Sequence, residues 1–454
     1  MEHREQFASR WGFALAAIGS AVGLGNIWRF PFMAGENGGG AFISLYFLFI
    51  LLFGIPALMA MILIGRRGGK SPVGSTQALA VADGHSREWK WLGWLTLSVA
   101  FFALTFFSVV AGWVLAYLVK SVMGELIGLS PSASVELFNL VKSDPVAMTF
   151  WHGVFMVLTM SIVGQGVRSG VERAVSLMMP ALFVILLFLV AYAAVTADFS
   201  SAIEFMFVPD FDRVDSQVVL LALGQAFFSL SVGGGGIIAY GAYLQREASI
   251  PKTAVLIASA NVSVDLLAGL AIFPLVFAYG LKASAGPGLL FETLPVAFSQ
   301  MPGGGLVGSL FFVLVLFAAL STSISMLESV VSRLIERPGA TRARMTGIAG
   351  SVIWFIGLGS VFSYNLLADF KPLAFISLFE DFTIFRLVDF FVVNVLILTS
   401  AILITVFVGY VMSRKSTREE LGLGDHVIFR IWHFNMRYVA PPVIFLIFVV
   451  TLTG

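Results

Sequence analysis

The sequence predicts an all-α membrane protein that crosses the bilayer many times. Of its 454 residues, 58% are hydrophobic and only 12% are charged, whereas soluble domains carry about 25% charged residues. Apolar stretches longer than about 18 residues recur along the whole chain, and each is long enough to cross about 30 Å of hydrocarbon. The mean hydropathy of +0.95 agrees with this class. The surroundings of most of the chain are therefore expected to be membrane lipid.

We expect one polytopic domain over residues 1–454 with about eleven spans. They lie near 11–36, 40–64, 91–124, 147–165, 171–196, 217–245, 253–280, 304–335, 345–362, 382–412 and 435–453. Basic residues cluster after even-numbered spans, at 66–70, 168–173, 333–344 and 414–437. The positive-inside rule then predicts a cytoplasmic N-terminus and a C-terminus outside.

The composition also argues against several classes of function. A net charge of +1 gives no sign of a nucleic-acid partner. The absence of cysteine excludes disulfides, thiol catalysis and Cys-ligated metal sites. We find no nucleophile–base set, metal cluster or phosphate-binding loop, so we do not expect an enzyme.

Two spans are interrupted by glycine at corresponding places. The first breaks at "GSAVGLGN" (19–26), and the sixth, five spans later, breaks at "SLSVGGGG" (229–236). Paired interruptions of this kind indicate a transporter built from inverted repeats. The first repeat would cover about 11–196 and the second about 217–412, with one additional span at about 435–453. Unwound backbone at membrane depth must be buried or line a wet cavity, so the breaks mark a binding site.

Longer motifs around these breaks resemble a known family. The stretch "GSAVGLGNIWRFPFMAGENGGGAF" (19–42) resembles the first-helix signature of the neurotransmitter:sodium symporter family, whose fold is called the LeuT fold. Agreement continues at "SVVAGW" (108–113), "GVERAVSLMMP" (170–180), "GQAFFSLSVGGG" (224–235) and "GPGLLFETLPVAFSQMPGG" (286–304). The resemblance runs from residue 4 to about 450. It implies that helices 1 and 6 are unwound in mid-membrane, and that the protein is a sodium-coupled amino-acid transporter of the bacterial inner membrane.

The resemblance also implies two sodium sites built from oxygen ligands, as a hard cation requires. The first would combine the substrate carboxylate with the Ala21 carbonyl and the side chains of Asn26, Ser229 and Asn261. The second would use carbonyls of Gly19, Val22 and Ala318 with the hydroxyls of Ser321 and Thr322. In the alternative interpretation, "ALSTSIS" (319–325) only packs helices through small polar residues.

A substrate carboxylate is expected at the helix N-terminus near Leu24 and Gly25, where free amides attract anions. Monoamine transporters of the family carry Asp at the position of Gly23, so glycine favours a substrate with its own carboxylate. The remaining pocket walls map to Ser20, Ala103, Phe107, Phe228, Ser231, Gly234, Thr322, Ser325 and Met326. Small residues at Ala103 and Gly234 leave room for a bulky aliphatic or aromatic side chain.

Charges at membrane depth predict gates. By resemblance, Arg29 and Asp389 form an outer gate with Phe228 as a lid. Arg4 and Glu336 form an inner gate near Tyr243. Static pairs that only join helices are the alternative. In bacterial relatives the spacing of Gly170 and Pro180 lets the fifth helix unwind and wet the second sodium site; a generic kink would need no such role.

Asp265 lies one turn after Asn261 on the same helix face. Chloride-dependent relatives carry serine there, and the bound anion supplies the negative charge. A built-in carboxylate is therefore expected to replace chloride. The alternative is that Asp265 only caps a buried polar cluster.

Three residues depart from the family pattern. Phe107 replaces a tyrosine, Met61 a glutamate of the second span and Phe7 a tryptophan of the inner gate. These departures keep two other functions open: sodium-coupled transport of a sulfonate, an osmolyte or an amine, and a substrate sensor that does not transport. The sequence leaves the number of coupled ions and the oligomeric state open.

Overall fold

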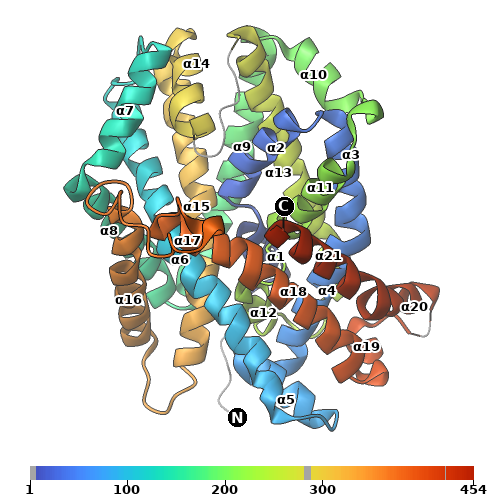
Figure 1. Ribbon diagram of the computed structural model, residues 1–454. Helices are drawn as coiled ribbons and strands as arrows, with labels where there is room; N and C mark the ends of the chain where they lie inside the picture. Colours follow the sequence, from blue (N-terminus) through green and yellow to red (C-terminus); the bar gives the residue numbers. More distant parts are fainter. Residues whose placement is uncertain (1–6, 281–287, 425, 454) are drawn as a thin grey trace.

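The computed structural model is helical throughout the part that it describes, which is residues 7–280, 288–424 and 426–453 (Figure 1). Within these residues, nine helices are long and apolar enough to cross a membrane. These are Gly40–Gly68 (α3, η2, α4), Arg87–Val122 (mainly α6, Lys90–Val122), Pro145–Gly164 (α8), Val167–Thr196 (η4, α9), Ile250–Ala278 (α13), Gly304–Leu334 (α15), Arg342–Phe362 (α16), Ile384–Val411 (α17, η8, α18, η9) and Val427–Leu452 (α20, η10, α21).

The bent first span brings the number of crossings in the described residues to ten, and the predicted sixth span contains only shorter helices. The first consists of α1 (Arg10–Ala21) followed by η1 (Gly25–Arg29) and α2 (Phe30–Glu36), and the two parts are bent by 53°. The predicted span at 217–245 contains α11 (Ser216–Ser229) and α12 (Gly235–Gly241). Neither of these is long enough to cross the membrane alone.

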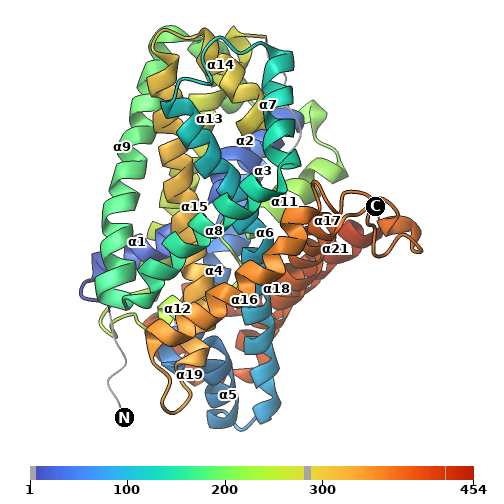
Figure 2. The same cartoon turned by 90° about the vertical axis from the view of Figure 1, so that its left-hand side faces the viewer.

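Shorter helices cap the two ends of the bundle. In Figures 1 and 2, α7 (Pro131–Ser143), α10 (Phe199–Phe207) and α14 (Leu294–Gln300) lie toward the upper end. At the lower end lie α5 (Pro72–Ala82) and α19 (Arg414–Leu421). The ends differ in composition, because the basic clusters at 66–70 and 414–421 border α5 and α19.

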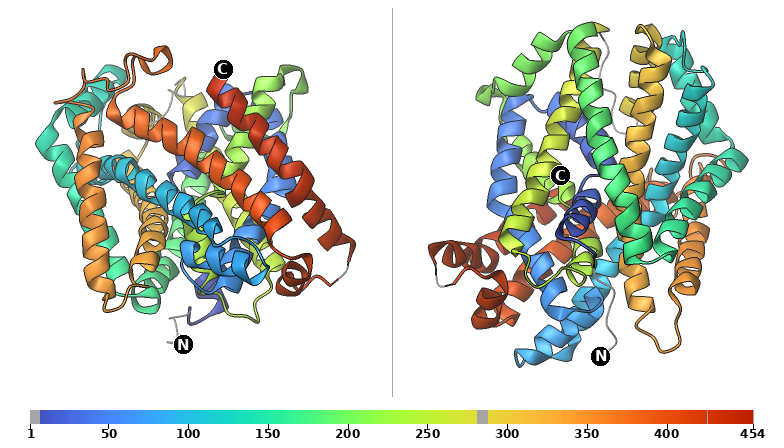
Figure 3. Two further views of the ribbon diagram at one scale, coloured as in Figure 1. Left: turned by 60° about the horizontal axis from the view of Figure 1, so that its bottom comes forward. Right: turned by 180° about the vertical axis from the view of Figure 1, so that it is seen from behind.

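The broken helices lie in the interior of the bundle. Helix α1 contacts α9, α12, α13 and α15, and α12 packs on α4, α6 and α15. The right-hand view of Figure 3 shows α1 (dark blue) between α13 (yellow-green) and α9 (green). Residues such as Ala17, Val22 and Ile238 are therefore fully buried although they border breaks in the backbone.

Close helix packing near the breaks requires glycine. A Cβ on Gly65 of α4 would lie 2.1 Å from the Ile238 carbonyl oxygen of α12. By contrast, a Cβ on Gly347 of α16 would meet nothing within 4 Å. The approach of α4 to α12 fixes the position of the sixth span and thus one wall of the site.

The packing predicts opposite effects for two glycine substitutions. Gly65→Ala should lower the free energy of unfolding by about 1–3 kcal/mol, because the added methyl overpacks the contact with α12. Gly347→Ala, the matched control, should be neutral or stabilise by up to about 1 kcal/mol through helix propensity. Thermal unfolding in detergent measures both, and an equal response of the two variants would contradict this packing account.

Candidate functional site

The first helix breaks because its backbone approaches α15 closely. The backbone of Val22 is extended, with φ −76° and ψ 106°, and the helix resumes at Gly25. A Cβ on Gly23 would lie 2.7 Å from Thr322 Oγ1, and one on Gly19 would lie 2.9 Å from Ser321 Cβ. The Gly23 amide donates to Asn26 Oδ1 at 2.8 Å. The Asn26 side chain therefore replaces part of the hydrogen bonding that the helix loses at the break.

The second break contains a strained residue. Between Ser229 and Gly235 the chain leaves the helix, and Ser231 has φ +52°, the only positive φ of a non-glycine residue in the described ranges. Its hydroxyl donates to the Ser20 carbonyl at 3.1 Å, and Ser400 donates to the Gly233 carbonyl at 2.7 Å. Backbone strain of this kind persists where the surroundings hold it, typically at functional sites.

A fully buried polar cluster joins the two breaks. Asn26 Nδ2 donates to Ser229 Oγ at 3.1 Å, Asn261 Oδ1 at 2.9 Å and Asp265 Oδ1 at 2.8 Å. Tyr46 donates to Asp265 Oδ2 at 2.5 Å and lies 2.9 Å from Ser229 Oγ. Asn261 Nδ2 lies 2.6 Å from the same hydroxyl. The structure thus brings Asn26, Ser229, Asn261 and Asp265 together, with Ala21 immediately before the break.

The residues of the second predicted sodium set also converge. The Ser321 hydroxyl bonds the Ala318 carbonyl at 3.0 Å and lies 3.5 Å from the Val22 carbonyl. The Thr322 hydroxyl lies 3.3 Å from the Val22 carbonyl and 3.5 Å from that of Gly19. Three carbonyls and two hydroxyls therefore meet between α1 and α15, which is the oxygen-rich chemistry that a hard cation needs.

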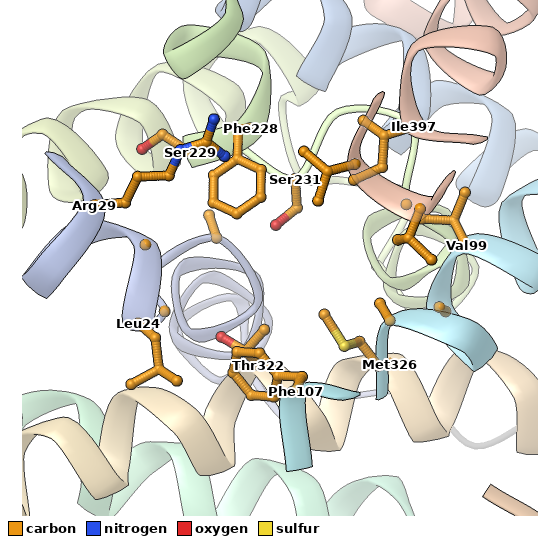
Figure 4. A pocket seen from close by; sticks show the side chains of 18 of the residues that line it. Leu24, Arg29, Val99, Phe107, Phe228, Ser229, Ser231, Thr322, Met326 and Ile397 are labelled. Atoms are coloured by element: carbon orange, nitrogen blue, oxygen red, sulfur yellow. The ribbon is translucent and has the colours of Figure 1, made fainter. Parts of the chain in front are cut away.

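A cavity of about 490 Å³ lies between the two breaks (Figure 4). All twelve residues predicted for the substrate line it: Ser20, Gly23, Leu24, Gly25, Ala103, Phe107, Phe228, Ser231, Gly234, Thr322, Ser325 and Met326. Ser20 and Ser325 make part of the cavity wall polar, and their hydroxyls form a hydrogen bond of 2.9 Å. Figure 4 shows Val99, Met326 and Ile397 together at one side of the cavity. The cavity therefore combines a helix N-terminus with a largely apolar wall.

Several lining residues were missed from the sequence. Val99, Phe106 and Phe385 add apolar surface, and Asn394 adds an amide. Asn394 lies in the π-helical segment η8 (Phe391–Leu396). A π-helical turn rotates the following residues relative to an α-helix, so regular helical spacing does not place Asn394 toward the cavity.

The outer-gate residues face the same cavity but do not form a direct pair. Arg29 lies over the Phe228 ring, with its guanidinium carbon 4.1 Å from the ring centroid. Asp389 lines the cavity, yet the ion pairs within 4.0 Å among the described residues do not include Arg29 with Asp389. Phe228, the expected lid, thus stacks on Arg29. Arg29 and Asp389 do not form the expected ion pair in this conformation.

The predicted inner gate is only partly described. Arg4 lies outside the described residues. Glu336 accepts from the Ser71 amide and hydroxyl, both at 2.7 Å, and from Arg333 at 2.8 Å. Phe7 is buried and makes edge contacts with the rings of Tyr240 and Tyr243. It therefore fills an apolar space where relatives have tryptophan.

A buried ion pair near Tyr243 was missed from the sequence. The Glu328 carboxylate is fully buried and accepts from Arg342 at 2.6 and 3.0 Å and from the Tyr243 hydroxyl at 2.7 Å. Arg342 also donates to the Val163 carbonyl at 3.3 Å. This cluster links α15 to α16, to the end of α8 and to the chain that follows α12. Leaving one such charge unpaired inside the protein costs several kcal/mol.

The fifth helix is continuous in this conformation. Gly170 lies in the π-helical turn Val167–Glu172, and Pro180 lies inside α9 (Arg173–Thr196). Glu172 accepts from the Ala8 amide at 2.8 Å and from the Ser9 hydroxyl at 3.4 Å. The start of the fifth helix is therefore tied to the start of the first. Unwinding between Gly170 and Pro180 stays a prediction.

Comparison with known proteins relates this geometry to one family. The profile of the Sodium:neurotransmitter symporter family matches residues 4–136 and 141–454. A Bacillus subtilis protein named as an uncharacterized sodium-dependent transporter, YhdH, is 37% identical over 98% of this chain and 96% of its own length. The human sodium- and chloride-dependent creatine transporter 1 is 26% identical over 73% of this chain and 60% of its own length.

A solved structure is similar over the whole chain. The crystal structure of MhsT in complex with L-phenylalanine matches with a TM-score of 0.89 and 37% identity, covering 99% of this chain and 100% of that one. The predicted all-helical membrane fold is confirmed by this match.

The buried polar cluster predicts that Tyr46, which the sequence did not indicate, contributes to the stability of the fold. Tyr46→Phe should lower the free energy of unfolding by about 1–3 kcal/mol, because Asp265 loses a buried hydrogen-bond donor. Tyr438→Phe is the matched control, since Tyr438 is 54% exposed. Thermal unfolding of both variants in the same detergent checks this. A Tyr46→Phe variant as stable as the control would show that the hydroxyl contributes nothing to the cluster.

Proposed function

Because the chain belongs to the sodium:neurotransmitter symporter family, we propose that it is a symporter importing a bulky aliphatic or aromatic amino acid with sodium by alternating access. The coarser activity, that of a sodium-dependent multi-pass membrane transporter, follows from the family. The observation that carries the finer proposal is the cavity between the two breaks, with a helix N-terminus at one side and an apolar wall at the other.

The shape and charge of the cavity support an amino acid as the substrate. The substrate carboxylate would bind at Leu24 and Gly25, where η1 begins. Gly23 leaves this end without a built-in carboxylate. A large side chain would occupy the space beside Ala103 and Gly234, against Val99 and Met326. The related MhsT structure contains L-phenylalanine, which supports the same class of substrate here.

We propose that two sodium ions bind beside this cavity. The first would be held by the Ala21 carbonyl, Asn26, Ser229, Asn261 and the substrate carboxylate, so that ion and substrate stabilise each other. The second would be held where α1 meets α15, by Gly19, Val22, Ala318, Ser321 and Thr322. The distances of 2.6–3.5 Å that already join these groups support both assignments.

One observation favours a second candidate function. Phe107 lines the cavity where most relatives have a tyrosine whose hydroxyl bonds the carboxylate. The missing hydrogen bond to a charged group corresponds to about 1.5–3 kcal/mol. An amine has no carboxylate and loses nothing when this hydroxyl is absent, and the change leaves a sulfonate or an osmolyte open as well. The second candidate is therefore sodium-coupled transport of such a compound.

We further propose the arrangement of the chain in the membrane. Residues 11–196 and 217–412 would form two inverted repeats of one domain, followed by the additional span at 435–453. The N-terminus would lie in the cytoplasm and the C-terminus outside the inner membrane of a bacterium. The basic residues that border α5 and α19 support this orientation.

Ligand-induced stabilisation tests the function. An amino acid that binds should raise the melting temperature of the purified protein in sodium but not in potassium, because a ligand stabilises the folded state by mass action. The panel comprises the common amino acids, taurine, betaine and amines. Asn26→Ala should abolish the shift, while Ser299→Ala, far from the cavity lining, should retain it.

The outcomes of this experiment separate the candidates. Stabilisation by taurine, betaine or an amine alone would favour the second candidate over amino-acid transport. An amino-acid shift of equal size in sodium and potassium would contradict sodium coupling. No ligand effect with any compound would contradict both.

Chloride independence is a separate prediction. Asp265 lies beside Asn26, Tyr46 and Ser229 and should supply the negative charge that an anion supplies elsewhere. Ligand-induced stabilisation should therefore be the same in chloride and in gluconate for the native protein. Asp265→Ser should make it depend on chloride, which a titration of chloride at constant sodium measures. Chloride dependence of the native protein would refute this assignment.

A further inference from the structure

One exposed region at the side of the bundle has both apolar and basic character. In Figure 1, α19 (Arg414–Leu421) and α20 (Val427–Phe434) project from the side of the bundle. Along α20, Val427, Ile428, Ile431 and Phe434 are 66%, 64%, 63% and 58% exposed. Their spacing places them on one face of the helix. The opposite residues, Phe429 and Trp432, are buried against the protein.

The charge distribution indicates that α20 lies near the membrane surface. Val427–Leu452 is a continuous span of 26 residues, and its basic residues lie in the first half, at Arg430 and Arg437, whereas α21 (Ala440–Thr453) carries none. Basic residues gather at the cytoplasmic end of a span, and a long arginine side chain extends along the helix toward the headgroups. The end that contains α20 is therefore expected at the level of the lipid headgroups.

Several basic side chains lie at this corner, among them Arg414, Lys415 and Arg437. Arg414 and Lys415 are exposed, and Arg414 lies 5.8 Å from the Phe429 ring centroid. Arg437 lies 4.6 Å from the Tyr410 ring centroid and 5.4 Å from that of Tyr438. Arginine and tyrosine in this combination are typical of the interface between lipid and water.

These charges lack acidic partners in the described part of the chain. The ion pairs within 4.0 Å involve none of Arg414, Lys415 and Arg437. Glu420 of α19 is occupied by Arg66 and Arg67 on the inner side. The buried Nε of Arg437 has no hydrogen-bond partner in the described chain. The corner thus presents positive charge directly beside an apolar face.

We propose that α19, α20 and η10 (Asn435–Val439) bind an anionic phospholipid. Its phosphate would lie between Arg414 and Arg437, and its acyl chains would follow the face formed by Ile431 and Phe434. Charge complementarity selects an anionic over a zwitterionic lipid, because each basic residue near a charged lipid surface contributes about fivefold in affinity. This site is independent of the substrate cavity and does not rest on the identity of the substrate.

The test is lipid-dependent stabilisation of the full-length protein in detergent at low salt. Phosphatidylglycerol should raise the melting temperature more than phosphatidylcholine with the same chains. The double variant Arg414→Gln/Arg437→Gln should need about 25-fold more phosphatidylglycerol for half of the effect. Arg344→Gln, which removes an exposed arginine at the start of α16, is the matched control and should respond like the native protein.

Further measurements separate a loss of lipid binding from misfolding and from binding of another molecule. Arg414→Gln alone changes an exposed residue and should shift the titration about fivefold, and Arg414→Lys should restore it. An unchanged titration in the double variant, or equal stabilisation by phosphatidylcholine, would overturn the proposal. Full competition by free glycerol phosphate would identify a soluble anion instead of a lipid. A dimer that Ile431→Ser dissociates would assign the face to a second copy of the chain.

Discussion

Two helices that break in the interior of the bundle must find hydrogen-bond partners for the backbone groups they expose. This constraint shapes the surroundings of both breaks, because neither lipid nor apolar side chains can bond these groups. The Asn26 side chain meets it at the first break, by accepting from the Gly23 amide and donating toward the second broken helix and α13. At the second break Ser400 donates to the Gly233 carbonyl, and Ser231 donates back to the Ser20 carbonyl of α1. The same polar groups that compensate the breaks surround a cavity, so compensation and ligand binding use one set of atoms.

The two sides of the cavity differ in how firmly they are joined. On the outer side, Arg29 stacks on Phe228 without a direct bond to Asp389. On the inner side, Glu328 bonds Arg342 and Tyr243, and Glu172 bonds the chain just before α1. The proposed alternating access would require the inner contacts to separate while the outer pair forms. Loss of the Glu172 contacts would release the start of α1 from the start of the fifth helix.

The sequence predicts the cavity well, because its residues come from long motifs around the two breaks. Glycine interruptions are visible in a single sequence, whereas Asn26, Ser229 and Asn261 were predicted as a set from the resemblance to the family. Tyr46 and Glu328 were missed for a physical reason. Each is one polar residue in an apolar helix, and its partner, Asp265 or Arg342, lies on another helix. Only helix packing shows which charges meet. Asn394 was missed because a π-helical turn changes the face of its helix. The closed outer pair was expected from the resemblance and from the charges, but the distance between Arg29 and Asp389 depends on conformation.

We propose that substrate and ion binding at the two helix breaks couples sodium to a bulky amino acid. Uptake of labelled phenylalanine into proteoliposomes tests it most directly, with sodium placed outside and potassium inside. Sodium coupling predicts accumulation above the external concentration that collapses when the sodium gradient is removed, and no accumulation by Asn26→Ala. Uptake that merely equilibrates, or that proceeds equally well in potassium, would contradict it.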